Sequence, residues 1–372
     1  MPIHDLGYRP WEGRTTSPWT RWMPITQSGV KIAWQNAWMR RLLWAAWLPA
    51  FYFALGFFLY EQWLKRTADW ITERLVAQNL IQPQEAEDSF KPLLTRALAG
   101  EAVEKLPFAQ RAMVRMALAT AQPQIDRLLR EGRRQLDEML PGVPKTLDRH
   151  TIWCWLMGMF FRYPQGMVMM LLVGMLAPPL AARDVSSKAF LLYFSRPIGW
   201  GDYLLGKLGV LWVYLGIISV GPALALYLFG VLLSPSLTVL EHTWDIPLRI
   251  AAATVVLVTP TSILALAFSS LTSRSWAAGF AWFAVWFFGY IGYQVIWLRT
   301  EWAERWDPSF SAASTEHWSL ISFYHVLRTV QGWIFGLESK MVLVQASAAV
   351  LVALTAVSLV VLSRRISAPI RQ

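Results

Sequence analysis

The chain has 372 residues, of which 55% are hydrophobic, 14% aromatic and only 16% charged. Soluble enzymes of this length carry more charge and fewer apolar residues, so the composition argues against that class and favours a membrane protein. The single cysteine, Cys154, excludes intrachain disulfides and zinc or iron–sulfur sites built from four thiolates. The formal net charge is +10, so the chain is strongly basic. Which partners this charge favours depends on where the basic residues lie along the chain.

Residues 1–41 precede the first long apolar run and are predicted to be cytoplasmic. They lack a compact apolar run followed by small residues, so we expect no cleaved signal sequence. Within them, residues 19–41 mix Trp and aliphatic residues with Lys and Arg at helical spacing. This pattern predicts an elbow-like amphipathic helix in the membrane interface, whereas residues 1–18 suit a disordered basic tail.

Six windows are apolar over the length that crosses a hydrocarbon core. The predicted spans are 42–60, 165–182, 204–233, 250–271, 277–297 and 341–362. Aromatic residues also precede the second span, but Arg162 and Pro164 interrupt them, and an arginine in mid-bilayer is expensive. We therefore place that aromatic stretch at the interface and predict an all-α polytopic membrane protein.

Residues 61–164, between the first two spans, are predicted to be an extracytoplasmic helical domain with an interfacial end. They combine helical apolar spacing with breaks before Pro83, Pro92, Pro107 and Pro123, which indicates several helices joined by short turns. Arginines cluster in this stretch, yet thirteen acids balance fourteen basic residues over 61–150. Pairing on solvated helix faces explains these arginines better than an anion-binding face does.

A second outer loop is predicted at 298–340, where four tryptophans and mixed charge suggest an interfacial cap. With six spans and the amino terminus inside, the inner segments hold fourteen Lys and Arg against four acids, which accounts for the whole charge of +10. The positive-inside rule therefore places both termini, the loop 183–203 and the tail 363–372 in the cytoplasm.

The basic residues flank membrane spans and do not form a stripe with interleaved aromatics. Membrane lipids with anionic headgroups are therefore the expected counterions, and no nucleic acid is expected as a partner. The predicted location is the cytoplasmic (inner) membrane of a prokaryote.

Residues 201–208 spell most of a phosphate-binding loop, but Leu208 replaces the hydroxyl that would ligate magnesium, and a span follows. We instead predict that Asp202 caps the incoming helix, that Gly206 lets a neighbour approach closely, and that Lys207 lies at the headgroup level. Nucleotide binding by this segment is not expected.

Other catalytic patterns are also missing from the sequence. No two histidines have the i,i+4 spacing of a helical zinc site, and no Gly-x-Ser-x-Gly sequence occurs. Serines such as Ser269 and Ser270 are interpreted as hydrogen-bonding residues at helix contacts. We expect no catalytic, cofactor-binding or metal-binding residues and no enzymatic activity in this chain.

The loop 183–203 is the most informative segment, because a short charged helix between two spans needs a partner outside the membrane. Asp184 or Ser186 can cap such a helix, and Pro197 can end it. Its apolar side chains, which are Phe190, Leu191 and Phe194, would dock in a groove of the partner.

This loop resembles that of the ABC transporter permease subunits of the type-2 exporter (ABC-2) family. The residues that carry the resemblance are Asp184, Tyr193, Ser195-Arg196-Pro197, Tyr203 and Gly206-Lys207. The helix before the first span and the six-span layout are similar too.

The resemblance implies a permease, expected to act as an exporter, that pairs with a second permease copy or a paralogue above separate ABC ATPase subunits. Those partner subunits would bind the ATP and magnesium, and the inner loop would hold the coupling helix. The residues implied to transmit its motion are Arg183, Asp184, Lys188, Phe190, Leu191, Phe194, Arg196, Pro197, Tyr203 and Lys207. The long segment 61–164 departs from the smallest family members and suggests an extracytoplasmic partner.

Two other functions stay open at this point. The same loop could serve a mechanotransmitter or membrane anchor, which moves an extracytoplasmic partner without passing cargo. An integral membrane enzyme that modifies lipids or polymers would need proton-transfer groups, for which Glu241, His242 and His317 are scattered candidates.

Overall fold

The computed structural model describes residues 17–86, 90–101, 107, 108, 110–119, 144, 146, 148–187, 189, 198–306 and 316–367. Its helices are η1 (Pro18–Thr20), α1 (Met23–Gln35), α2 (Ala37–Ala45), α3 (Leu48–Ala77), α4 (Pro83–Glu85), α5 (Lys91–Leu98), α7 (Arg149–Phe160), the π-helix η4 (Phe161–Gln165), α8 (Gly166–Ser186), α10 (Trp200–Leu233), α11 (Val239–Thr243), α12 (Asp245–Leu271), α13 (Ser275–Trp306), η6 (Glu316–Ile321), α14 (Phe323–Ile334) and α15 (Met341–Ser367).

Six helical stretches of the described chain are long and apolar enough to cross a membrane, which confirms the predicted all-helical, polytopic class. They are Ala37–Ala77, Arg149–Ser186, Trp200–Leu233, Val239–Leu271, Ser275–Thr300 and Met341–Ile366. Three of them, Ala37–Ala77, Arg149–Ser186 and Val239–Leu271, extend well beyond the predicted apolar windows, because a helix can continue past the hydrocarbon core.

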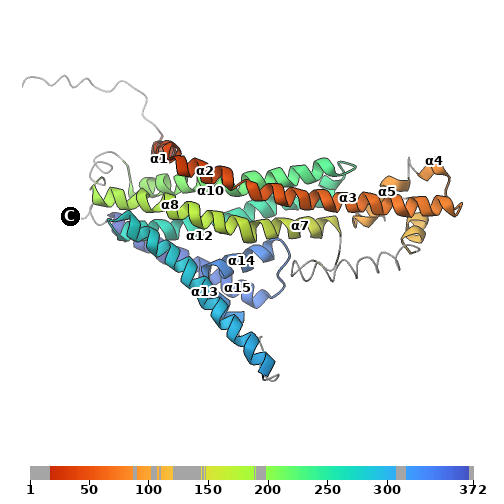
Figure 1. Ribbon diagram of the computed structural model, residues 1–372. Helices are drawn as coiled ribbons and strands as arrows, with labels where there is room; N and C mark the ends of the chain where they lie inside the picture. Colours follow the sequence, from red (N-terminus) through yellow and green to blue (C-terminus); the bar gives the residue numbers. More distant parts are fainter. Residues whose placement is uncertain are drawn as a thin grey trace, which may run out of the picture.

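The helix α12 forms the centre of the bundle. It packs against α8, α10, α13, α14 and α15, and 72% of its most apolar window is buried. The corresponding windows of α13 and α15 are only 17% and 22% buried. Figure 1 shows α13 leaning away from the bundle, with α14 and α15 beside it.

The second span differs from the sequence interpretation, because its helix does not begin after the arginine and proline. α7, η4 and α8 run continuously, and ten of the twelve residues of α7 are buried. The π-helical turn contains Pro164, whose missing N–H and ring would disrupt a regular α-helix. The aromatic residues before Arg162 are therefore part of this continuous helix and are buried among its neighbours.

The described residues between 83 and 119 pack on the far end of α3, and we call them the outer segment after their predicted location. This helix has 30 residues, so it is about 45 Å long and exceeds a hydrocarbon core of about 30 Å. A separate small core joins its outer half to α5 and to residues near 114. It consists of Ala68, Ile71, Leu75, Phe90, Leu94, Val114 and Ala117. Figure 1 shows α4 and α5 beside the end of α3, away from the other spans.

The helix α14 occupies part of the segment predicted to be a cap. Its twelve residues are too few to cross a bilayer, yet one face is buried against α12, α13 and α15. Gly336, with a φ of +73°, ends the helix and turns the chain toward α15. This segment is therefore built into the bundle wall.

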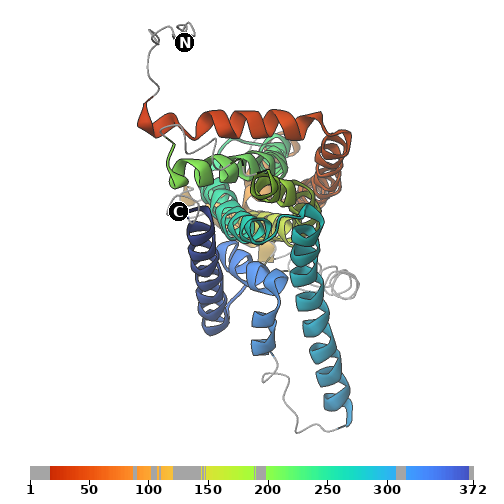
Figure 2. The same cartoon turned by 90° about the vertical axis from the view of Figure 1, so that its left-hand side faces the viewer.

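The helix α1 lies across the bundle, as its horizontal course in Figure 2 shows. It contacts α10 where Gly206 has no side chain: a Cβ there would lie 2.6 Å from the Cβ of Ile25. The hydroxyl of Thr26 donates to the Gly206 carbonyl at 2.9 Å. The predicted close approach at Gly206 is confirmed, and the neighbour is α1.

We expect Gly206→Ala to lower the free energy of unfolding by about 1–3 kcal/mol, because the β-branched Ile25 cannot move aside freely. Gly216→Ala, on the same helix, is the matched control, since a Cβ there has no neighbour within 4 Å. It should be neutral or stabilise by up to about 1 kcal/mol through helix propensity. Thermal unfolding of both variants in detergent measures the difference, and equal shifts would contradict the close contact.

Candidate functional site at the inner loop

The structure places four of the ten predicted coupling residues. Arg183 and Asp184 lie in the last turns of α8, and Tyr203 and Lys207 lie in the first two turns of α10. Lys188, Phe190, Leu191, Phe194, Arg196 and Pro197 lie outside the described residues. The two ends of the loop can therefore be examined directly.

Three of these side chains meet in one polar cluster between α8 and α10. The Asp184 carboxylate accepts a hydrogen bond from the Tyr203 hydroxyl at 2.7 Å and forms an ion pair with Lys207 Nζ at 2.7 Å. Tyr203 and Lys207 are four residues apart, so they share one face of α10, with Lys207 Nζ 5.4 Å from the centre of the Tyr203 ring. We call Asp184, Tyr203 and Lys207 the inner clamp.

The inner clamp adds to one prediction and corrects another. Lys207 is only 9% exposed, and its ammonium group is paired with Asp184 between the helices, which the sequence did not predict. Asp184 lies inside α8 and its carboxylate binds Tyr203 and Lys207, so it does not cap a short helix after α8. A cation buried between helices is stabilised by a carboxylate, which Asp184 supplies here.

The beginning of α10 is capped as predicted. The Asp202 carboxylate accepts the backbone N–H of Gly199 at 3.0 Å, which satisfies a donor at the helix start.

The helix α12 is joined to the end of α8 by Ser269. Pro178 and Pro179 lie inside α8 and have no N–H, so the carbonyls of Gly174 and Met175 lack their regular helical donors. The Ser269 hydroxyl donates to the Pro178 carbonyl at 2.7 Å and accepts from the N–H groups of Ala181 and Ala182 at 3.2 and 3.0 Å. The predicted helix-contact role of Ser269 is confirmed.

The helix α1 completes the surroundings of the inner clamp. A cavity of about 250 Å³ lies between α1, α2 and α8, and Asp184, Lys207 and Arg183 are among its lining residues. Farther along α10, the Tyr214 hydroxyl donates to the Val30 carbonyl of α1 at 2.8 Å. The ends of the loop are therefore linked by side-chain contacts to α1, α8, α10 and α12.

A second polar network, at the base of the outer segment, was not predicted. Arg149 donates from Nε and Nη2 to the two carboxylate oxygens of Glu61 at 2.9 and 3.1 Å, and its Nη1 binds Glu101. Arg96 Nε binds the other oxygen of Glu101 at 3.0 Å. Glu61 is 1% exposed and Glu101 6%, so this outer network is buried. A carboxylate directly after the apolar run 42–60 was the sequence signal that pointed to it.

The candidates for an enzymatic site do not form a cluster in the described chain. Glu241 and His317 are exposed, and His242 Nδ1 lies 3.3 Å from the Thr238 carbonyl of its own turn. Within the described ranges, no three His, Cys, Asp or Glu side chains are arranged to hold a metal ion.

Comparisons with protein-family models, with curated proteins and with solved structures find no match. Function is therefore inferred from the loop residues and from the geometry of the inner clamp. The inner clamp joins the end of α8 to the beginning of α10. It is suited to holding helix ends in a fixed relation.

Proposed function

We propose that this chain is the membrane-spanning permease subunit of an ABC transporter of the type-2 exporter kind. Separate ATPase subunits would drive it through residues 183–203, the coupling loop. The observation that carries the proposal is the contact between Asp184, Tyr203 and Lys207, three residues of the loop resemblance that lie in one buried cluster.

This contact supports a mechanical role for the loop. A loop whose two ends are joined by an ion pair moves both adjoining helices when it is pushed. Ser269 and Thr26 extend the connection to α12 and α1, so a push would change the packing of four helices. ATP-dependent closure of the partner subunits would in this way shift the spans between inward-open and outward-open states.

A mechanotransmitter is the second candidate, and α3 favours it. This helix continues without a break to Ala77 and carries Glu61 of the outer network. Motion of the first span would therefore reach the outer segment directly. Transport of cargo into vesicles that contain the chain and its ATPase separates the two functions: a mechanotransmitter hydrolyses ATP there and moves nothing across.

The orientation is tested by cysteine labelling of intact cells. In a Cys154→Ser background, Ser187→Cys should react with a membrane-impermeant maleimide only after the cells are opened, because Ser187 is an exposed residue of the coupling loop. Phe108→Cys, an 85% exposed position in the predicted outer segment, is the control that should react in intact cells. Labelling of Ser187→Cys in intact cells would show that the loop faces the outside, and it would contradict the proposal.

The partner contact is tested with Phe190→Asp combined with Phe194→Asp. ATP hydrolysis that co-purifies with the tagged chain should fall at least about tenfold, because a carboxylate in an apolar groove costs more than about 1.4 kcal/mol. Phe108→Asp makes the same chemical change at an exposed site and should leave the co-purified activity unchanged. Unchanged activity in the double variant would contradict docking through these side chains.

A further inference from the structure

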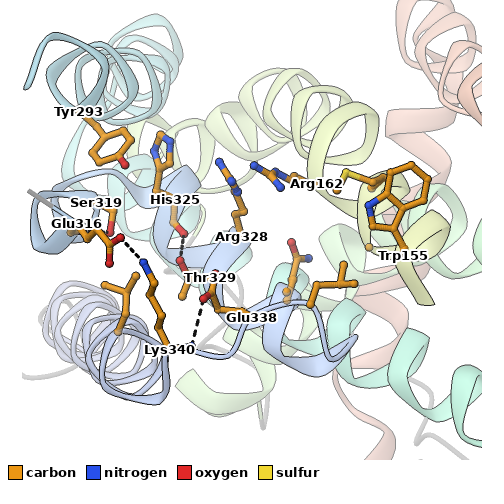
Figure 3. A pocket seen from close by; sticks show the side chains of 16 residues that line it. Trp155, Arg162, Tyr293, Glu316, Ser319, His325, Arg328, Thr329, Glu338 and Lys340 are labelled. Atoms are coloured by element: carbon orange, nitrogen blue, oxygen red, sulfur yellow. Dashed lines mark hydrogen bonds and ion pairs between the residues drawn. The ribbon is translucent and has the colours of Figure 1, made fainter. Parts of the chain in front are cut away.

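A cavity of about 330 Å³ lies between α7, η4, α13, α14 and the beginning of α15. This volume is at the small end of the range for ligand pockets. Figure 3 shows its lining, which includes the cations Arg162, Arg328 and Lys340 and the acids Glu316 and Glu338. We call it the outer pocket, because the predicted orientation places the start of α15 toward the outer side.

The charges in the outer pocket are separated. Lys340 Nζ forms an ion pair with Glu316, and the backbone N–H of Lys340 donates to Glu338 Oε1 at 3.3 Å. Both acids are therefore engaged at the Lys340 end. Figure 3 shows Arg162 and Arg328 on the other side of the pocket, away from the pair of Glu316 and Lys340.

The two arginines have no carboxylate partner among the residues that the structure describes. The Tyr324 hydroxyl donates a hydrogen bond to the backbone carbonyl of Arg162 at 3.1 Å. The Nε of Arg162 is nevertheless buried without a hydrogen-bond acceptor in the described chain. Two guanidinium groups that share one small pocket repel each other unless an anion lies between them.

Trp155 supplies a third donor. It is only 8% exposed, and its indole N–H is buried without an acceptor in the same described part of the molecule. Figure 3 draws the indole nitrogen on the side of the ring that faces the other lining residues. A buried donor without an acceptor costs about 1–3 kcal/mol, so an acceptor in the pocket would be favourable.

His325 does not add a further charge at neutral pH. Burial, and next the nearby positive charge of Arg162, lower the pKa of His325 to about 4. Its Nδ1 lies 2.9 Å from the Ser322 hydroxyl, which fixes the ring. The electrostatic character of this side of the pocket is therefore set by the two arginines.

We propose that the outer pocket binds a phosphate-type oxyanion, held by the guanidinium groups of Arg162 and Arg328 and by the indole N–H of Trp155. Guanidinium groups match the geometry of phosphate oxygens and bind them through paired hydrogen bonds. The anion is either the headgroup phosphate of a lipid or a free phosphate. Such binding is independent of the ATP-driven function.

The test uses the full chain in detergent with two probes, inorganic phosphate and phosphatidylglycerol, each compared with chloride at equal ionic strength. The thermal midpoint should rise with at least one probe, in the wild type and in Arg299→Gln, which removes an exposed arginine of α13 outside the pocket. Arg162→Gln and Arg328→Gln should lose the rise. A rise with phosphatidylglycerol alone assigns a headgroup, and a rise with phosphate alone assigns the free ion.

Trp155→Phe keeps the ring and removes the donor, and it provides a second measurement if an arginine variant fails to fold. Its dissociation constant for the effective probe should increase about tenfold, as expected for one lost hydrogen bond to a charged group. No rise with either probe in the wild type overturns the proposal. The proposal is also overturned if Trp155→Phe keeps the wild-type dissociation constant and both glutamine variants keep the wild-type rise in thermal midpoint.

Discussion

Arg149→Met should lower the free energy of unfolding by about 3–5 kcal/mol, because it leaves the buried carboxylates of Glu61 and Glu101 without their shared cation. Glu61 would lose both of its hydrogen bonds from arginine, at a site that is 1% exposed. Glu101 would keep Arg96, so most of the loss should arise at Glu61. Thermal or denaturant unfolding of the purified chain measures the change.

Lys91→Met is the matched control for this prediction. It also removes a cation that joins α5 to α3, through an ion pair with Asp69. The side chains of Lys91 and Asp69 are both 40% exposed, so the free energy of unfolding should fall by less than about 1 kcal/mol. Combining Arg149→Met with Glu61→Gln and Glu101→Gln should recover much of the stability, since no buried charge then lacks a partner. Equal losses for Arg149→Met and Lys91→Met would show that the outer network does not hold the outer segment in place.

The sequence was sufficient for features that depend on one helix at a time. Apolar length predicts the six membrane-length helices, and the spacing of Asp202 and Gly206 predicts a cap and a close contact. Each of these follows from the local geometry of a single helix or its ends. None of them requires knowing which helix is the neighbour.

Such reasoning does not predict the buried ion pairs, because they join residues that lie far apart in the chain. Glu61 and Arg149 are separated by 88 positions, and periodicity along α3 or α7 does not show which faces meet. Lys207 therefore suggested a headgroup contact, and Arg162 with Pro164 suggested the end of a span. The structure pairs Lys207 with Asp184 and continues the helix past Pro164 through a π-helical turn, and the local sequence pattern predicts neither arrangement.

Under the proposed function, Asp184→Asn and Lys207→Gln should each uncouple the chain from the proposed ATPase subunits without releasing them. Either change removes the ion pair between Asp184 and Lys207 from a largely buried site, so the ends of α8 and α10 lose the contact that holds them together. ATP hydrolysis per bound partner should fall at least about tenfold, which corresponds to about 1.4 kcal/mol of lost interaction. The amount of partner that co-purifies should stay the same, because the docking side chains of the coupling loop are intact.

The double variant Asp184→Asn with Lys207→Gln decides whether the ion pair or the residues themselves matter. The two neutral amides can hydrogen-bond to each other, and the amide oxygen introduced on α8 can still accept from the Tyr203 hydroxyl. No buried charge then lacks a partner, so stability and a part of the coupled hydrolysis should return.

Asp202→Asn is the matched control, since it neutralises an acid in the same turn of α10 that lies outside the inner clamp. It should cost only about 1 kcal/mol through the helix cap. If the two single variants keep the wild-type ratio of ATP hydrolysis to bound partner, the inner clamp does not transmit motion from the coupling loop. The inner clamp would then contribute to the stability of the fold alone. The loop would have to act on the spans through residues other than Asp184 and Lys207.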